Sequence, residues 1–197
     1  MHIRILAALA LGLALMGCTM GLGEKLDPKL VQSFKLQQVS VAVPPETKFW
    51  WGDGERAYAR SIGRSEAESQ TLGATPEGRT YMRGLASDRI KTAFDRELTG
   101  RLNGTRPVHV EVIMDDIYIS SPIEQVLLGA SFRMKGRARL VDARTGQEIA
   151  INPNLTVTAG GTGGIVGTMA DRAIAGDPMD RLAANLAQSY RNWLLVN

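Results

Sequence analysis

The most reactive side chain in this sequence is the thiol of Cys18, the only cysteine among 197 residues. It directly follows Leu15-Met16-Gly17, which ends an apolar run that starts at Ile3. Without a second cysteine, this thiol has no partner for a disulfide within the chain. Its other roles are those of a buried inert side chain, a nucleophile, a metal ligand or an acceptor of a lipid. The residues before Cys18 distinguish between these roles.

Residues 1–17 have the layout of an export signal. Arg4 gives a short positive start, and the apolar residues after it give way to small ones before Cys18. The stretch is too short to span a bilayer, because about 14 helical residues cover about 21 Å of a core about 30 Å thick. The ending Leu15-Met16-Gly17-Cys18 resembles the lipobox of bacterial lipoproteins, in which an aliphatic, a tolerated and a small residue precede an obligatory cysteine.

This resemblance implies that Cys18 receives a diacylglycerol through a thioether and that a peptidase cleaves the Gly17–Cys18 bond. It also implies N-acylation of the freed amine, for example with palmitate, and several acyl chains together anchor stably. In such lipoproteins an Asp directly after the cysteine favours retention at the inner membrane. The chain has Thr19 there. The resemblance therefore predicts an anchor in the outer membrane, facing the periplasm, with inner-membrane retention left open.

A second set of candidate residues is a row of four cations at alternating positions, which predicts that they share one face of a strand. The apolar residues between them predict that the other face is buried. Acidic cross-strand neighbours such as Glu111 and Glu148 would make the row an ordinary solvated sheet face. The alternative is a docking strip for lipid headgroups, glycan-linked carboxylates or an acidic partner. The row consists of Arg133, Lys135, Arg137 and Arg139.

Two adjacent carboxylates, Asp115 and Asp116, interrupt another predicted strand at residues 107–120. Apolar residues alternate up to Met114 and then resume at Ile117 with the opposite phase. This slip predicts a β-bulge at the two acids. Without a bulge, neighbouring strand residues point to opposite faces and do not converge on one substrate.

Other catalytic and metal-binding patterns are missing, so the sequence predicts no enzyme, no metal site and no cofactor beyond the acyl chains on Cys18. His109 is the one histidine after the signal, and no G-x-S-x-G sequence accompanies it. The glycines at 160–167 lack the spacing of a nucleotide fingerprint and favour a flexible loop. A hydrolase of envelope polymers that uses two carboxylates remains an alternative.

After removal of the signal with Arg4, 22 Lys and Arg face 20 Asp and Glu. This near neutrality argues against nucleic-acid binding. The 180 residues from Cys18 onward suffice for one domain with a sizeable core. We expect the signal at 1–17, a lipidated tether at 18–35 and a single domain at 36–197.

The periodicity predicts the elements of that domain in turn. A strand at 35–43 stops at Pro44-Pro45, and a long excursion at 44–75 contains Trp50 and Trp51. An amphipathic helix starts at Thr75-Pro76 and ends at Asn103-Gly104, with Tyr81 on its apolar side. Strands follow at 107–120, 131–143 and 147–151, the last resuming at 155–158, and a second helix starts at 177–180.

The predicted fold class is α+β, with a single, mostly antiparallel sheet of three to four strands and two amphipathic helices packed on one face. This order resembles small periplasmic lipoproteins of the YajG type, the penicillin-binding-protein activator LpoB and transport-auxiliary lipoproteins. The resemblance implies a non-catalytic binding or assembly module of the envelope that acts on a protein partner. An accessory subunit of a transport system is the alternative within the same resemblance.

Overall fold

The computed structural model describes residues 26–120, 130–161 and 177–195. Helices and strands alternate in groups along the chain, and their bounds are as follows: α1 Pro28–Gln32, β1 Phe34–Ala42, β2 Lys48–Trp51, α2 Gly52–Ser61, the 3-10 helix η1 Glu66–Glu68, α3 Ser69–Gly73, α4 Pro76–Leu98, β3 Arg106–Ile119, β4 Ala130–Asp142, β5 Glu148–Gly161 and α7 Pro178–Leu195.

The strands form one mixed sheet in the order β1-β3-β4-β5, and β2 also pairs with β3. β3, β4 and β5 are antiparallel neighbours, whereas β1 and β2 both run parallel to β3. The predicted α+β class is confirmed, but the sheet has five strands rather than three to four. Two of its pairings are parallel because helices α2 to α4 carry the chain back before β3 begins, as parallel pairing requires.

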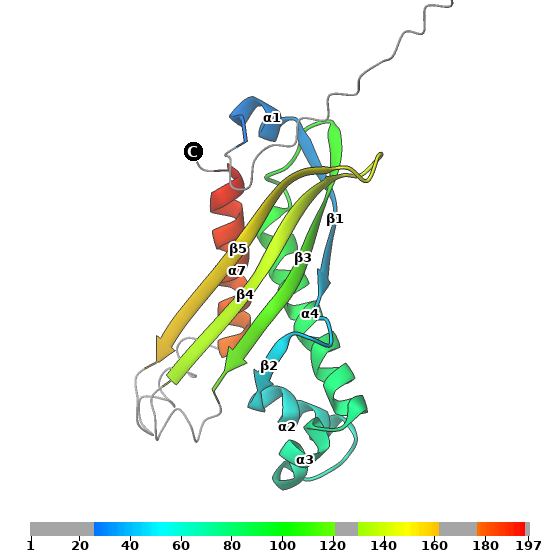
Figure 1. Ribbon diagram of the computed structural model, residues 1–197, viewed down its shortest axis with the longest axis vertical. Coiled ribbons are helices and arrows are strands. Elements are labelled where there is room, and N and C mark those ends of the chain that lie inside the picture. The colour runs from blue at the N-terminus through cyan, green and yellow to red at the C-terminus, as the bar shows by residue number, and fades with distance from the viewer. Residues whose placement is uncertain (1–25, 121–129, 162–176, 196–197) are drawn as a thin grey trace, which may run out of the picture.

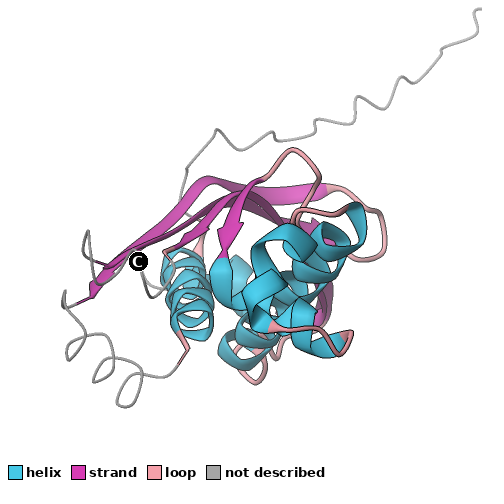
Figure 2. Ribbon diagram, turned by 90° about the horizontal axis from the view of Figure 1, so that it is seen from below, coloured by secondary structure: helices cyan, strands magenta, loops and turns pink. Residues whose placement is uncertain are grey.

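Helices α4 and α7 pack against each other and cover the same side of the sheet (Figures 1 and 2). α4 contacts β1, and α7 contacts β4 and β5. This confirms the prediction of two helices on one face, which we call the inner face. On the opposite, outer face, no described helix covers the strands (Figure 2). The sheet therefore presents one side to the core and the other to solvent.

The folded domain begins earlier than the predicted boundary at residue 36. Asp27 caps α1 by accepting a hydrogen bond from the backbone N–H of Lys29 at 2.8 Å. Leu26 and Val31 are 6% exposed and Phe34 is fully buried, and all three belong to the main core. Residues 26–35 are therefore part of the domain and not of a tether, because their apolar side chains fill the space at the start of β1.

The excursion at 44–75 is more ordered than its sequence suggested, since it holds β2, α2, η1 and α3. The two tryptophans have different environments. Trp51 is 2% exposed, whereas Trp50 is 39% exposed. Trp51 is therefore a core residue and does not form an exposed pair with Trp50. The four residues of β2 alternate between the two faces of the sheet, so Lys48 and Trp50 lie on one side and Phe49 and Trp51 on the other.

α4 starts as predicted, with the Thr75 hydroxyl accepting a hydrogen bond from the N–H of Gly78 at 3.1 Å. It ends at Leu98 rather than at Asn103-Gly104. Tyr81, predicted on the apolar side, is 36% exposed, and its ring lies 5.3 Å from that of Tyr58. Met82 and Ala86 take the buried positions instead, on the helix face that also buries Ile90 and Phe94.

Candidate functional site

The outer face of β3 is organised by a β-bulge between Met114 and Asp116, as the phase slip predicted. The register places Met114 opposite Gly136 of β4 and Asp116 opposite Lys135, so Asp115 is the extra residue. Apolar side chains on both sides of the bulge, Met114 and Ile117, remain buried. The extra residue thus lets both carboxylates lie on the outer face, which regular alternation does not permit.

The bulge is supported from both neighbouring strands. On one side, β1 ends at Ala42 and β2 begins at Lys48, and the buried Thr47 between them donates its hydroxyl to the carbonyl of Met114 at 2.8 Å. On the other side, β4 approaches so closely at Gly136 that a Cβ there would lie 2.5 Å from the carbonyl oxygen of Ile113. A side chain at position 136 is therefore excluded by the backbone of β3.

The four cations of the predicted row share the outer face of β4, and three of them meet carboxylates of β3. Arg139 contacts Glu111 directly, and Glu148 lies 3.8 Å away. Arg137 donates to Asp115 at 2.7 Å. These are the acidic cross-strand neighbours that the first interpretation of the row expected. Each of these arginine side chains is 40% exposed or more, so each pair contributes about 0.2–1 kcal/mol to stability.

The other half of the row has a different composition. Arg133 pairs with Asp116 at 2.8 Å and lies over the ring of Tyr118, 5.9 Å from its centroid. Lys135 stands opposite Asp116 on β4, and Lys48 stands opposite the same residue on β2. Neither lysine forms an ion pair with any described residue. One carboxylate thus lies among three cations.

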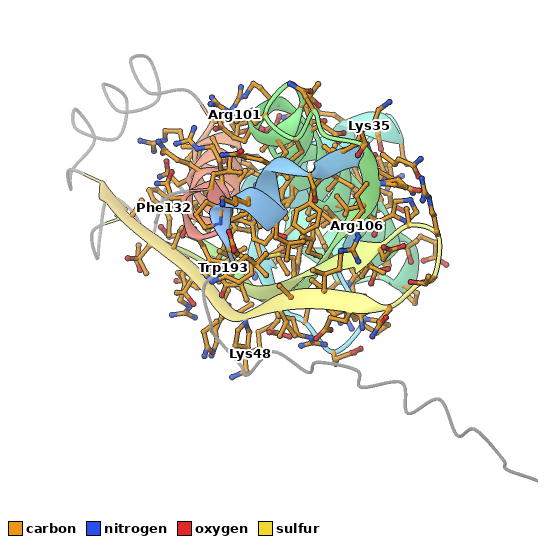
Figure 3. The ribbon with its side chains drawn as sticks, turned by 90° about the horizontal axis from the view of Figure 1, so that it is seen from above. Lys35, Lys48, Arg101, Arg106, Phe132 and Trp193 are labelled. Carbon is orange, nitrogen blue, oxygen red and sulfur yellow. The ribbon has the colours of Figure 1, made fainter. Side chains whose placement is uncertain are left out.

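Trp50 completes this region, because the register of β2 sets it beside Tyr118 on β3. We call the five residues Lys48, Trp50, Tyr118, Arg133 and Lys135 the cationic aromatic patch. Viewed along the sheet, Lys48 projects away from the helices, on the outer side (Figure 3). The patch combines two aromatic rings with an excess of positive charge at the β2 end of the sheet.

Sequence reasoning found Arg133 and Lys135 but missed Lys48 and Trp50 as their neighbours. In the structure, Lys48-Phe49-Trp50-Trp51 alternates as exposed, half-buried, exposed and buried. Four residues after two prolines are too few to distinguish a strand from a loop by periodicity. Only the pairing with residues 116–119 assigns them to the outer face.

On the helical side, Arg89 of α4 forms a second charged cluster. It donates to Asp177 at 2.6 Å and to Asp180 at 3.3 Å, and its guanidinium lies 5.2 Å from the ring centroid of Trp51. Burial lowers the pKa of Arg89, but the hydrogen bonds and charges of the two aspartates raise it, and the net pKa lies above the ordinary value. Because Asp177 also accepts from the N–H of Met179, the cluster ties the start of α7 to α4.

Two open hollows, of about 360 and 230 Å³, flank Arg89. Within the described ranges, no three His, Cys, Asp or Glu residues are grouped so as to hold a metal ion. His109 lies half-buried on β3 between Gln38 and Val141. None of the described helices is both long and apolar enough to cross a membrane.

Several predicted features lie outside the described residues. These are the signal, the Gly17–Cys18 bond and the lipid acceptor Cys18, together with Thr19 and most of the glycine-rich segment at 160–167.

No family model and no curated protein matches this sequence. Among solved structures, a Xanthomonas campestris protein of family DUF330 has 12% identity and a TM-score of 0.42, covering 89% of this chain and 92% of its own. A candidate lipoprotein from Caulobacter crescentus has 17% identity and a TM-score of 0.30, covering 54% and 77%. Lipoprotein GNA1162 from Neisseria meningitidis has 15% identity and a TM-score of 0.27, covering 64% and 82%. Similarities at this level assign neither a family nor a function to the chain.

Proposed function

We propose that this protein is a lipid-anchored lipoprotein of the bacterial cell envelope that acts as a non-catalytic binding module through the outer face of its sheet. The lipobox-like Leu15-Met16-Gly17-Cys18 supports the anchor. The one-sided covering of the sheet supports the binding role, because a sheet face with ordered charges and two aromatic rings is presented to solvent. By the proposal, the anchor lies in the outer membrane and the domain faces the periplasm.

The arrangement of the carboxylates favours binding over hydrolysis. A glycosidase of the usual kind needs one protonated and one ionised carboxyl group on either side of a bond. On the outer face, Glu111, Asp115 and Asp116 each accept hydrogen bonds from an arginine. All three carboxylates are therefore engaged in ion pairs within the sheet rather than placed on either side of an open substrate site.

The anchor is tested by Cys18→Ser in the producing bacterium. We expect the variant to lose acyl label and to leave the membrane fraction or to accumulate unprocessed. A membrane fraction and label equal to those of the unmodified protein would contradict the anchor.

The binding face is tested by placing a photo-crosslinker at Thr156, which is exposed and opposite Lys135. The matched control is Gln188, exposed on α7 on the helical side. We expect a defined adduct from position 156 and none from position 188. Equal adducts at both positions, or bulk lipid alone at both, would contradict a binding role for the outer face.

A further inference from the structure

We infer that the cationic aromatic patch binds an anionic glycan, a chain of sugar rings that carries carboxylates. This inference rests on the proposed function, since it names the class of ligand for the outer face.

The chemistry of the patch gives the first argument. The strand register sets Trp50 beside Tyr118, whose ring already carries the guanidinium of Arg133. The side chain of Trp50 is 39% exposed, and this exposed indole is an apolar surface on which a sugar ring can stack. Lys48 and Lys135 stand on either side of Asp116 without an ion pair of their own to a described residue. Two ammonium groups that make no ion pair within the described part of the chain favour an anion. The exposed hydroxyls of Thr156 and Thr158 lie opposite Lys135 and Arg133 and can hydrogen-bond to sugar hydroxyls.

The shape of the patch gives the second argument. It crosses β2, β3 and β4 and reaches β5, so its width is about 14 Å at about 4.8 Å per strand, and it is two residue rows deep, or about 7 Å. A stable protein partner needs about 800 Å² on each side, several times this area. Beyond the patch the face is neutralised by the pairs of Arg137 and Arg139. A narrow strip across the strands suits an extended polymer better than a folded protein.

The place of the patch gives the third argument. The described chain enters the domain at α1, at the opposite end of the sheet from β2 (Figure 1). Along β3, the ten steps from Val108 to Tyr118 span about 33 Å. An anchor on Cys18 would leave residues 18–25 as the connection, at most about 28 Å when extended. The patch thus lies at the end remote from the anchor, which favours a ligand other than the anchoring bilayer.

The test uses the lipidated full protein in detergent and measures binding by titration calorimetry. The probes are muropeptides released from peptidoglycan by a muramidase, neutral chitooligosaccharides, polyglutamate, and vesicles that contain phosphatidylglycerol. We expect the muropeptides to bind at least tenfold more tightly than the chitooligosaccharides or polyglutamate. Equal or tighter binding of any of the other three probes, or no binding of muropeptides, would overturn the inference.

Two surface variants locate the site. Trp50→Gln, and separately Lys48→Gln with Lys135→Gln, should each weaken muropeptide binding at least tenfold without changing the melting temperature by more than a few degrees. The matched control, Lys29→Gln with Lys91→Gln, removes the same charge elsewhere and should bind like the unmodified protein. Equal loss in the control, or no loss in either patch variant, would overturn the inference.

The muropeptide titration and the crosslinking experiment together separate this inference from the proposed function. If muropeptides fail to bind but the adduct at position 156 persists, the glycan ligand is wrong and the binding face stands. Loss of both contradicts the proposed function.

Discussion

The two halves of the cation row on β4 differ although their sequence pattern is the same. Arg137 and Arg139 face Asp115 and Glu111, and on the far edge of β3 they have only the small or neutral side chains of β1, such as Ser40 opposite Glu111. Arg133 and Lys135 share one carboxylate, and the far edge of β3 carries Lys48 and Trp50 from β2. The charge and side-chain composition around each half therefore depend on the strand on the far side of β3, which is β1 for Arg137 and Arg139 and β2 for Arg133 and Lys135. Alternating cations along one strand do not by themselves define a binding surface.

Gly136→Ala should have the largest effect on stability, and it acts at the point where the two halves of the row meet. The new Cβ would lie 2.5 Å from the carbonyl oxygen of Ile113, so backbone has to move. We expect a loss of about 3 kcal/mol in the free energy of unfolding, at the upper end for overpacking. Urea denaturation measures it. The control Gly84→Ala, whose new Cβ has no atom within 4 Å besides its chain neighbours and the backbone of its own helix, should stabilise α4 by up to about 1 kcal/mol. Equal effects at both sites would contradict the close approach.

Thr47→Val should have the next largest effect. It removes the hydroxyl that donates to the carbonyl of Met114 and leaves this buried acceptor without that bond. We expect a loss of about 1–2 kcal/mol in the free energy of unfolding. Faster amide hydrogen exchange in β2 than in β1 should accompany it, because Thr47 leads directly into β2. If stability falls but amide exchange is no faster in β2 than in β1, the Thr47 hydroxyl does not hold β2 in its register beside β3.

A smaller effect should follow from Glu111→Gln with Asp115→Asn, which converts the paired half into one with an excess of cations. The exposed ion pairs contribute little, so stability should change by less than about 1–2 kcal/mol. Polyglutamate should now bind in a salt-dependent way, whereas muropeptide binding should stay within twofold, because no tryptophan lies at this half. A matching gain in muropeptide binding would show that charge alone distinguishes the halves.

The smallest effect concerns the end of β4 beyond Arg139. Asp142 accepts hydrogen bonds from Arg106 and from the N–H groups of Arg144 and Thr145. The bond from Arg106 and those from the backbone lower the pKa of Asp142 below its ordinary value of 3.8. The folded state thus favours the ionised form, and its stabilising contribution is present above pH 3.8 and is lost as the pH falls through the lowered pKa.

Melting curves of the protein and of Asp142→Asn measure this contribution. The variant should melt at a lower temperature near neutral pH, and the difference should shrink as the pH falls below 3.8. A difference that is constant across this range would contradict the lowered pKa.

The sequence predicted most of the framework because long periodic segments carry their own signal. The start of α4 at Thr75, the bulge at Asp115-Asp116 and the start of α7 at Asp177 were all predicted and found. The bulge was detectable because Val108, Val110 and Val112 define a phase from which Ile117 departs.

What the sequence did not predict depends on partners distant in the chain. β2 is four residues long, and it is a strand only because it pairs with residues 116–119 of β3. The parallel pairing of β1 likewise depends on a partner that begins at Arg106. The patch combines residues from three strands, so the prediction of its Arg133 and Lys135 could not include Lys48 and Trp50. The pairing of Arg89 with Asp177 links positions 88 residues apart and leaves no local pattern.

The parallel edge of the sheet also bears on the order in which the molecule folds. β3, β4 and β5 follow one another along the chain and can assemble through short-range contacts. β1 must wait for residues 106–113, about 70 positions later, so its pairing is of much longer range than those within β3, β4 and β5. In a chain made from its N-terminus, the first strand to emerge therefore stays without its strand partner until β3 has been made. During that interval its apolar residues lack the neighbouring strand β3, and misassembly and recognition by chaperones compete with folding.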